Sequence, residues 1–138
     1  MFNVSLPLDD NDALVLVTLE KNQNKIKIKS LIDTGAEYSQ VSSDVAQKLN
    51  LYNSNYQDAG EIRVDNGSYN VYKTDVNIIV FLKDLLKNSS NRNSVSADHH
   101  IGETITVLFP KDKSVQSSVP MIIGRETIEK LGLVIQIE

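Results

Sequence analysis

The sequence predicts an all-β barrel or sandwich that is interrupted by two short helices. Many short segments alternate apolar and polar residues with a period of two, which is typical of half-buried strands. Clusters of Asn, Asp, Ser and Gly separate these segments, as turns do between short strands. The length of 138 residues and the apolar fraction of 41% indicate one domain, residues 1–138, with a core of its own.

The first strands are expected near the N-terminus. Residues 2–8 alternate apolar and polar, and the apolar run 14–19 leads into the polar turn 21–24. Residues 25–29 alternate Lys with Ile, which predicts a strand with one solvated face rather than a ligand site. The run and the alternating segment therefore form a hairpin. Further strands are expected at 61–64, 68–72, 75–82, 103–109, 119–123 and 133–137.

The first helix is expected to begin where Ser43 and Asp44 can cap it. It carries Val45 and Leu49 at positions i and i+4, and Asn50 is placed to end it.

The second helix is expected at 125–131, directly before the last strand. Ile128 and Leu131 lie on one of its faces. Glu126 and Lys130 are spaced for an i, i+4 ion pair. Gly132 stands where a left-handed residue ends a helix.

Composition excludes several classes of protein. The net charge is -4, and no basic stripe with interleaved aromatic residues is present, so we expect no nucleic-acid partner. The absence of Cys excludes disulfides and thiolate metal sites. The first residues do not resemble a signal peptide, and no apolar run approaches a membrane span, so a cytoplasmic location is expected if the sequence is full-length.

Residues 87–98 are almost wholly polar and predict a long loop inserted into the domain. His99 and His100 follow this loop. Adjacent residues of a strand face opposite ways, so these two side chains are expected on the solvated surface and not at a metal. No metal and no other cofactor are therefore expected.

Two parts of the sequence echo each other weakly. "LIDTG" precedes "QKLNL", and "MIIGR" precedes "EKLGL". Each part predicts a strand, a turn with a glycine and a short helix, with an apolar residue directly after the helix. The second part has no Asp, and either duplication or coincidence accounts for the likeness.

Asp33, Thr34 and Gly35 form the motif that carries chemistry. Peptide hydrolysis can be performed by two adjacent carboxylates that share one proton and activate a water. The chain has a single D-T-G and no D-S-G, and Asp65-Asn66-Gly67 is a hairpin turn signal. One chain therefore holds half of such a site, and a two-fold dimer would bring Asp33 against its own copy.

Three segments, in order, resemble the retropepsins, the retroviral-type aspartic proteases. "SLIDTGAEYSQVS" is similar to their catalytic strand and loop, and "GEIRVDNGSYNVY" is placed like their flap hairpin. "VPMIIGRETIEKLGLVIQI" is similar to their Gly-Arg strand, C-terminal helix and last interface strand. The resemblance implies an acid-protease half-barrel that is active as a C2 homodimer on a peptide or protein substrate, with the first and last strands pairing across the dimer.

The resemblance also implies a role for each site residue. Asp33 is the catalytic aspartate of each subunit, and Thr34 locks the two active-site loops together. Arg125 pairs with Glu37. The residues that would bind substrate are Leu31, Gly35, Ala36, Glu37, Asn66, Gly67, Pro120, Met121 and Ile122, of which Asn66 and Gly67 belong to the flap tip.

The flap is where the sequence departs most from the viral enzymes. Its tip is polar and has one glycine, Gly67, where viral flaps are apolar and rich in glycine. Glu37 also stands where these proteases usually have Asp. The polar flap favours the alternative reading, a retropepsin-like dimerisation or peptide-binding module with little turnover. The intact Asp33 motif favours an aspartic endopeptidase.

Overall fold

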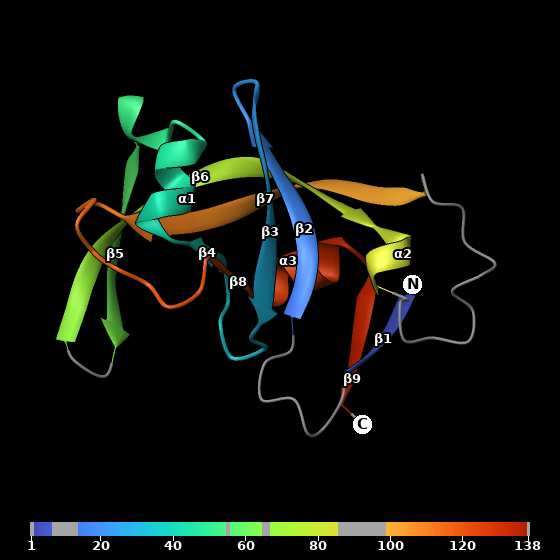
Figure 1. Ribbon diagram of the computed structural model, residues 1–138. Coiled ribbons are helices and arrows are strands. Elements are labelled where there is room, and N and C mark those ends of the chain that lie inside the picture. Colours follow the sequence, from blue (N-terminus) through green and yellow to red (C-terminus); the bar gives the residue numbers. More distant parts are fainter. Residues whose placement is uncertain (1, 7–13, 55, 65–66, 86–98, 138) are drawn as a thin grey trace.

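A seven-stranded mixed sheet and a separate pair of terminal strands make up the fold (Figure 1). The computed structural model describes residues 2–6, 14–54, 56–64, 67–85 and 99–137. The strands are β1 (Phe2–Leu6), β2 (Leu14–Lys21), β3 (Asn24–Ile32), β4 (Ser39–Val41), β5 (Gln57–Val64), β6 (Gly67–Phe81), β7 (His100–Pro110), β8 (Met121–Ile123) and β9 (Leu133–Ile137). The helical elements are α1 (Ser43–Lys48), the 3-10 turn η1 (Leu51–Asn53), α2 (Leu82–Leu85) and α3 (Arg125–Lys130).

The large sheet closes partly on itself. Its strand order is β2-β3-β8-β4-β7-β6-β5, and β2 also pairs with β6. This extra pairing curls the sheet around the apolar side chains, as in a barrel. The all-β prediction is therefore confirmed. The largest fully buried side chains are Phe109, Leu19, Leu49, Leu51, Ile78, Leu82, Ile105, Met121, Ile123, Val17, Val45 and Val71.

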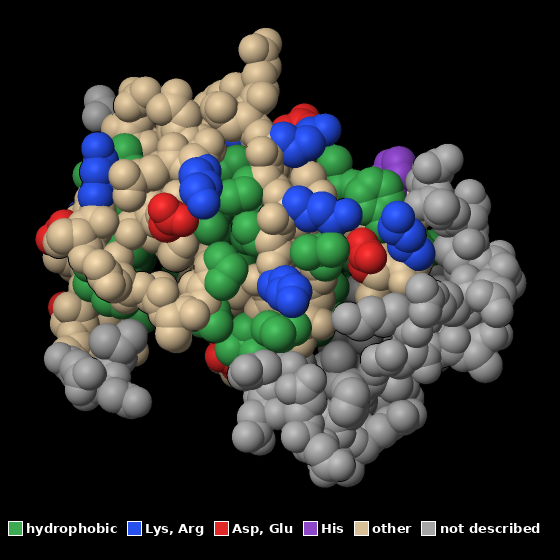
Figure 2. All heavy atoms as spheres, viewed as in Figure 1, with side chains coloured by type: hydrophobic (Ala, Val, Ile, Leu, Met, Phe, Trp, Pro, Cys, Tyr) green, Lys and Arg blue, Asp and Glu red, His purple; other side chains and the backbone are tan. Residues whose placement is uncertain are grey.

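The predicted N-terminal hairpin is confirmed. Strands β2 and β3 pair antiparallel, and their turn contains Asn22 and Gln23 with φ of 50° and 71°. Lys25, Lys27 and Lys29 are exposed, and Ile28 between them is buried, which is the predicted alternation. Figure 2 shows Lys and Arg side chains spread among hydrophobic ones over this face.

One strand replaces two predicted ones. Strand β6 runs through 15 residues, so the segments 68–72 and 75–82 are continuous. Val71 is buried near its start, and Val76 and Ile78 are buried later, so the buried positions change from odd to even along the strand. This change of phase made one long strand look like two short ones in the sequence.

The N-cap of helix α1 lies one residue earlier than predicted. Ser42, and not Ser43, is the N-cap, and its hydroxyl accepts a hydrogen bond from the Val45 N–H at 3.1 Å. The Ser43 side chain is buried and donates to the carbonyl oxygen of Val115 at 2.8 Å instead. Asn50 follows the helix with a left-handed φ of 61°, as its predicted role required.

Helix α3 is confirmed, and so is its buried face of Ile128 and Leu131. Its end at Gly132 has φ of 68°, the left-handed value expected. The predicted Glu126–Lys130 pair is wrong, because both side chains bond the backbone of β7. Glu126 Oε1 accepts from the Thr106 N–H at 2.9 Å, and Lys130 Nζ donates to the Thr104 carbonyl oxygen at 2.9 Å.

The chain ends form the small sheet. Strands β1 and β9 pair in parallel, from Phe2 against Leu133 to Leu6 against Ile137. Both predicted strands are thus present, and within one chain they are each other's neighbour. Their pairing across a dimer stays a prediction. Elements α2 and η1 were not predicted, and the predicted polar loop 87–98 lies outside the described residues.

Candidate active site

The D-T-G motif forms a tight turn at the end of strand β3. The Asp33 N–H donates to the Ile123 carbonyl oxygen at 3.0 Å, which ties the turn to strand β8. The Gly35 N–H donates to Asp33 Oδ1 at 2.9 Å, and the Ala36 N–H donates to the Asp33 carbonyl oxygen at 3.2 Å. One carboxylate oxygen is therefore held by the backbone, and the side chain remains exposed.

A side chain at position 35 would crowd this carboxylate. A Cβ atom on Gly35 would lie 3.2 Å from Asp33 Oδ1, closer than side chains normally approach. Thr34 is exposed beside it, and its hydroxyl has no hydrogen-bond partner in the part of the chain that the structure describes. The turn thus presents a carboxylate and a hydroxyl to the outside of the chain.

The two sequence echoes meet at this turn. Strand β3 runs parallel to β8, with Ile32 opposite Ile123. Helix α3 follows directly after β8, whereas the short strand β4 separates β3 from helix α1. The Arg125 N–H donates to the Ala36 carbonyl oxygen at 2.8 Å, and the Glu126 N–H donates to that of Glu37 at 3.0 Å. These bonds satisfy the first free N–H groups of helix α3 and hold the active-site loop in place.

A buried polar contact reinforces the junction. The hydroxyls of Ser39 and Thr127 lie 2.5 Å apart, and both residues are fully buried. Ser39 Oγ also accepts a hydrogen bond from the Gly124 N–H at 3.1 Å. Sequence inspection missed this network, because nothing local marks two hydroxyl residues 88 positions apart as partners.

The segments that carry Glu37 and Arg125 are linked by backbone hydrogen bonds and not by a contact between the two side chains. Both residues are exposed, and the ion pairs among the described residues do not include them. Their loops are nonetheless joined by the backbone bonds from Arg125 and its neighbour. A Glu37–Arg125 ion pair stays a prediction.

Three side chains form a row facing away from the core beside the Asp33 turn. Leu31 lies opposite Ile122, and Ile122 lies opposite Gln40, so neighbouring strands β3, β8 and β4 each contribute one. Leu31 and Ile122 were predicted to line the cleft, and Gln40 was not. Gln40 faces outward because Ser39 and Val41 on either side of it are buried, and successive side chains of a strand face opposite ways; a strand of only three residues gave no sequence signal for this.

Met121 corrects the predicted pocket. It is 1% exposed and packs in the core, because it precedes Ile122 on β8 and must face the opposite way. Pro120 and Ala36 are half-buried, and Gly67 is exposed at the start of β6. Asn66 lies outside the described residues.

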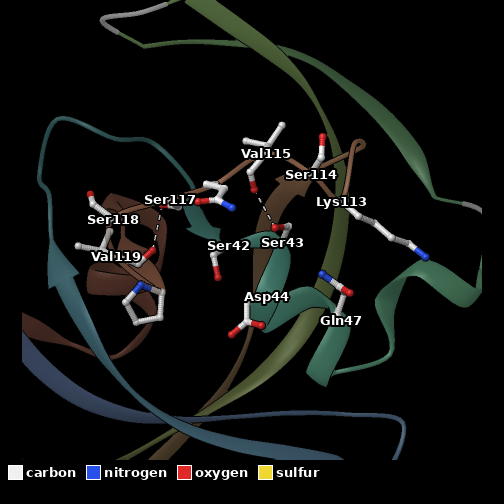
Figure 3. Close-up of a pocket in the computed structure, with 12 residues that line it drawn as sticks. Ser42, Ser43, Asp44, Gln47, Lys113, Ser114, Val115, Ser117, Ser118 and Val119 are labelled. Atoms are coloured by element: carbon white, nitrogen blue, oxygen red, sulfur yellow. Dashed lines mark hydrogen bonds between the residues drawn. The ribbon is translucent and has the colours of Figure 1, made fainter.

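Two hollows flank the loop between β7 and β8. The smaller, of about 320 Å³, includes Gln40, Tyr69 and Ile122 in its lining. The larger, of about 570 Å³, is polar and lies between the start of α1 and this loop (Figure 3). Asp44 and Gln47 of helix α1 are part of its lining.

The loop between β7 and β8 is held by its own hydrogen bonds. Asp112 Oδ1 accepts from the N–H and the hydroxyl of Ser114 at 2.8 and 2.7 Å. These bonds, the hydroxyl first, lower the pKa of the Asp112 carboxyl. Tyr52 donates to the Pro110 carbonyl oxygen at 2.5 Å, and burial raises its pKa to about 12. The loop is thus anchored beside the cleft.

No group of three or more His, Cys, Asp or Glu residues in the described ranges is arranged to hold a metal ion. His99 and His100 are both exposed, as predicted. None of the described helices is long and apolar enough to cross a membrane.

Comparison by sequence and by structure gave different results. No protein-family model matches the chain, and no curated protein matches it. Among solved structures it is similar to the EIAV protease in complex with an inhibitor, with 18% identity, a TM-score of 0.53, and 91% of this chain and 93% of that chain covered. It is also similar to a retropepsin-like aspartic protease from Rickettsia conorii, with 14% identity, a TM-score of 0.54, and 89% and 83% covered.

These similarities extend over most of each chain, and they agree with the order of the elements around Asp33. The all-β half-barrel, the D-T-G turn after β3 and the Gly124 turn after β8 occur together in one sheet. The chain therefore has the fold of the retropepsin-like aspartic proteases.

Proposed function

We propose that the chain is an aspartic endopeptidase that is active as a C2 homodimer, with one Asp33 from each subunit. The observation that carries the proposal is the exposed Asp33 carboxylate, fixed by the Gly35 N–H at the end of a core strand. The matching turn after β8 has Gly124 and no acidic residue in its place. A chain with one such carboxylate needs a second copy to complete a pair.

The two carboxylates would work as one unit. Like charges in contact cannot both ionise cheaply, so the pair holds one proton between them. The ionised Asp33 accepts a proton from water, and the oxygen of that water attacks the peptide carbonyl carbon. The protonated Asp33 of the other copy donates a hydrogen bond to the carbonyl oxygen. Collapse of the tetrahedral intermediate breaks the C–N bond, and a proton passes to the leaving nitrogen.

The substrate would bind as an extended strand between the site and the two flaps. The backbone of Gly35 and Glu37 would hold the peptide, and Thr34 would bond the partner's loop. The outward-facing Leu31 and Ile122 give apolar contacts. The remaining proposed contacts are Ala36, Pro120 and the flap residues Asn66 and Gly67.

The test is a peptide-library cleavage assay of the wild-type protein and of Asp33→Asn at acid and neutral pH. Asn is nearly isosteric but cannot accept the proton from water, so cleavage should fall about 10³-fold or more. Sedimentation of both proteins should find the same dimer, because the substitution removes like-charge repulsion. The wild-type rate should rise and fall with pH as a coupled pair does.

Asp44→Asn is the matched control, since Asp44 is an exposed carboxylate that pairs with Lys48 away from the turn. It should cleave at the wild-type rate. Turnover by Asp33→Asn close to that of the wild type would reject the aspartic mechanism. Equal binding of extended peptides by both proteins, without any cleavage, would favour the binding module instead.

A further inference from the structure

A hollow of about 320 Å³ lies over strands β4 and β8, next to strand β3, which ends at the Asp33 turn. It is at the lower end of the roughly 300–1,000 Å³ typical of ligand pockets. Its floor is formed by Ile122 and Gln40, which lie opposite each other on β8 and β4. Ile122 precedes Ile123, whose carbonyl oxygen accepts the Asp33 N–H. The lining residue Ile122 is therefore next in sequence to the residue that holds the Asp33 turn.

Part of the wall of this hollow is apolar. Tyr69 reaches it from strand β6, and Pro110, Val115 and Val119 come from the loop between β7 and β8. Tyr69 is half-buried, and burial raises the pKa of its hydroxyl, so the ring bears a neutral group at working pH. These walls suit the carbon stem of a side chain.

Neutral amides and the hydroxyls of Ser42, Ser117 and Ser118 supply the polar part of the lining. Gln40 lies on the floor and Gln116 on the loop. Neither side chain has a hydrogen-bond partner within the described ranges, so both amides are available to a ligand. The lining residues that are described include no Asp, Glu, Lys, Arg or His. A charged side chain entering here would find no counter-ion.

The wall on the loop side is fixed before any ligand binds. The Ser42 N–H donates to the Pro120 carbonyl oxygen at 2.9 Å, and Ser43 donates to that of Val115 at 2.8 Å. The Val115 N–H in turn donates to the Asp112 carbonyl oxygen at 3.2 Å. Both ends of the wall are thus bonded to the rest of the chain, and such preorganisation favours selective binding.

We propose that this hollow, the Gln40 pocket, selects an uncharged substrate side chain with an amide or hydroxyl at its tip, such as Gln, Asn or Thr. The proposal rests on the proposed function, because it names the substrate class of the same cleft. An aliphatic side chain would fill the stem region but leave the Gln40 amide unpaired. A Glu or Lys side chain would lose water without gaining a partner charge.

The larger hollow does not have this chemistry. Asp44 and Lys113 line it on opposite sides, and Gln47 lies between them in Figure 3. Gln47 is exposed and does not line the Gln40 pocket. It therefore offers a matched glutamine with which to separate a local effect of Gln40 from a general effect of removing an amide.

The experiment measures binding apart from cleavage. Peptides that carry Gln, Leu, Glu or Lys at each position in turn are titrated into Asp33→Asn protein. At one position of the peptide, or at two positions related by the dimer symmetry, the peptide with Gln should bind about five- to tenfold more tightly than the peptide with Leu. Glu and Lys there should bind at least about tenfold more weakly than Gln. Gln40→Met should abolish the advantage of Gln over Leu, and Gln40→Glu should turn the preference toward Lys. Gln47→Met should change neither.

The inference is overturned if no position prefers Gln, or if the preference survives Gln40→Met. Binding of no peptide at all overturns it as well. Cleavage of the same peptides by the wild-type protein reports separately on the proposed function. Cleavage without a preference for Gln would reject the proposed selectivity of the Gln40 pocket and leave the proposed protease activity standing. A Gln preference that depends on Gln40, without cleavage, would support the proposed selectivity of the Gln40 pocket and reject the proposed protease activity.

Discussion

Gly124 is the residue at which the two turns of the site come closest. It is buried, and a Cβ atom there would lie 2.6 Å from both the carbonyl carbon and the oxygen of Tyr38, and 2.9 Å from the Ala36 oxygen. These are backbone atoms, which cannot turn away as a side chain can. We therefore expect Gly124→Ala to destabilise the fold by about 1–3 kcal/mol, as overpacking does, with the urea midpoint as the measurement.

Gly102 is the control for this change. A Cβ on Gly102 would have only an ordinary contact of 3.8 Å, with the Ile78 oxygen. Gly102→Ala should therefore lie within about 0.5 kcal/mol of the wild type, as surface substitutions usually do. If Gly124→Ala were equally mild, the active-site loop would not be packed against β8 as described.

At the scale of elements, strand β5 is tied to the loop that follows β7. Lys111 Nζ lies 2.7 Å from Asp58 Oδ2 and 5.2 Å from the centre of the Tyr72 ring. The Gly60 N–H donates to Asp58 Oδ1 at 3.0 Å, where the pairing of β5 with β6 is irregular. Lys111, and then the Gly60 N–H, lower the pKa of the Asp58 carboxyl.

This tether gives a pH dependence with a definite sign. Because the pKa of Asp58 is lower in the folded chain, the unfolded chain binds its proton first as pH falls. The stabilisation is complete above the unfolded pKa of about 3.9 and is lost progressively as the pH falls from there through the lower pKa of the folded chain. Thermal unfolding from pH 6 to 3 should show a smaller acid-induced loss for Asp58→Asn than for the wild type. The effect should be small, since the pair is exposed.

Lys111→Met provides the second arm of this test. It removes the main cause of the lowered pKa and should reduce the acid-induced loss in the same direction. The double variant should then behave like Asp58→Asn alone, because once the carboxylate is gone the Lys111 substitution has nothing further to change in the acid-induced loss, whereas Lys111→Met alone still leaves the Gly60 hydrogen bond. Additive effects would mean that the two residues act on stability independently.

Elements were easier to predict from sequence than the contacts between them. Alternation identified the β2–β3 hairpin and most other strands, since burial of one sheet face leaves a local period of two. The side chains with competing partners were not predictable. Ser43 bonds Val115, and Glu126 and Lys130 bond strand β7, because partners distant in sequence replace the local ones. Met121 and Gln40 depended on the phase of two strands of three residues each, too short to reveal their facing.

For the whole molecule, the terminal strands and the Asp33 turn raise the same question of a second copy. The Asp33 motif was visible in the sequence, but a single chain contains no second D-T-G and no D-S-G. Among the described strands, β1 and β9 have only each other as neighbours, so each keeps one edge unpaired. Unpaired strand edges readily accept another strand. A symmetric contact through such an edge would bring the same surface of two chains together.

Deleting residues 133–138 tests this assembly. The deletion removes all of β9 and the partner of β1, so we expect monomers without peptidase activity. Sedimentation velocity measures the assembly, and cleavage of a wild-type substrate measures the activity.

The deletion also removes the Leu133 side chain, which is 8% exposed and belongs to the core. A shorter deletion of 135–138 keeps Leu133 and most of that packing, and circular dichroism checks that both proteins remain folded. If the shorter deletion also yields a folded, inactive monomer, the loss comes from the strand edge rather than from the core. An active protein of unchanged size after the full deletion would contradict a site shared through the chain termini.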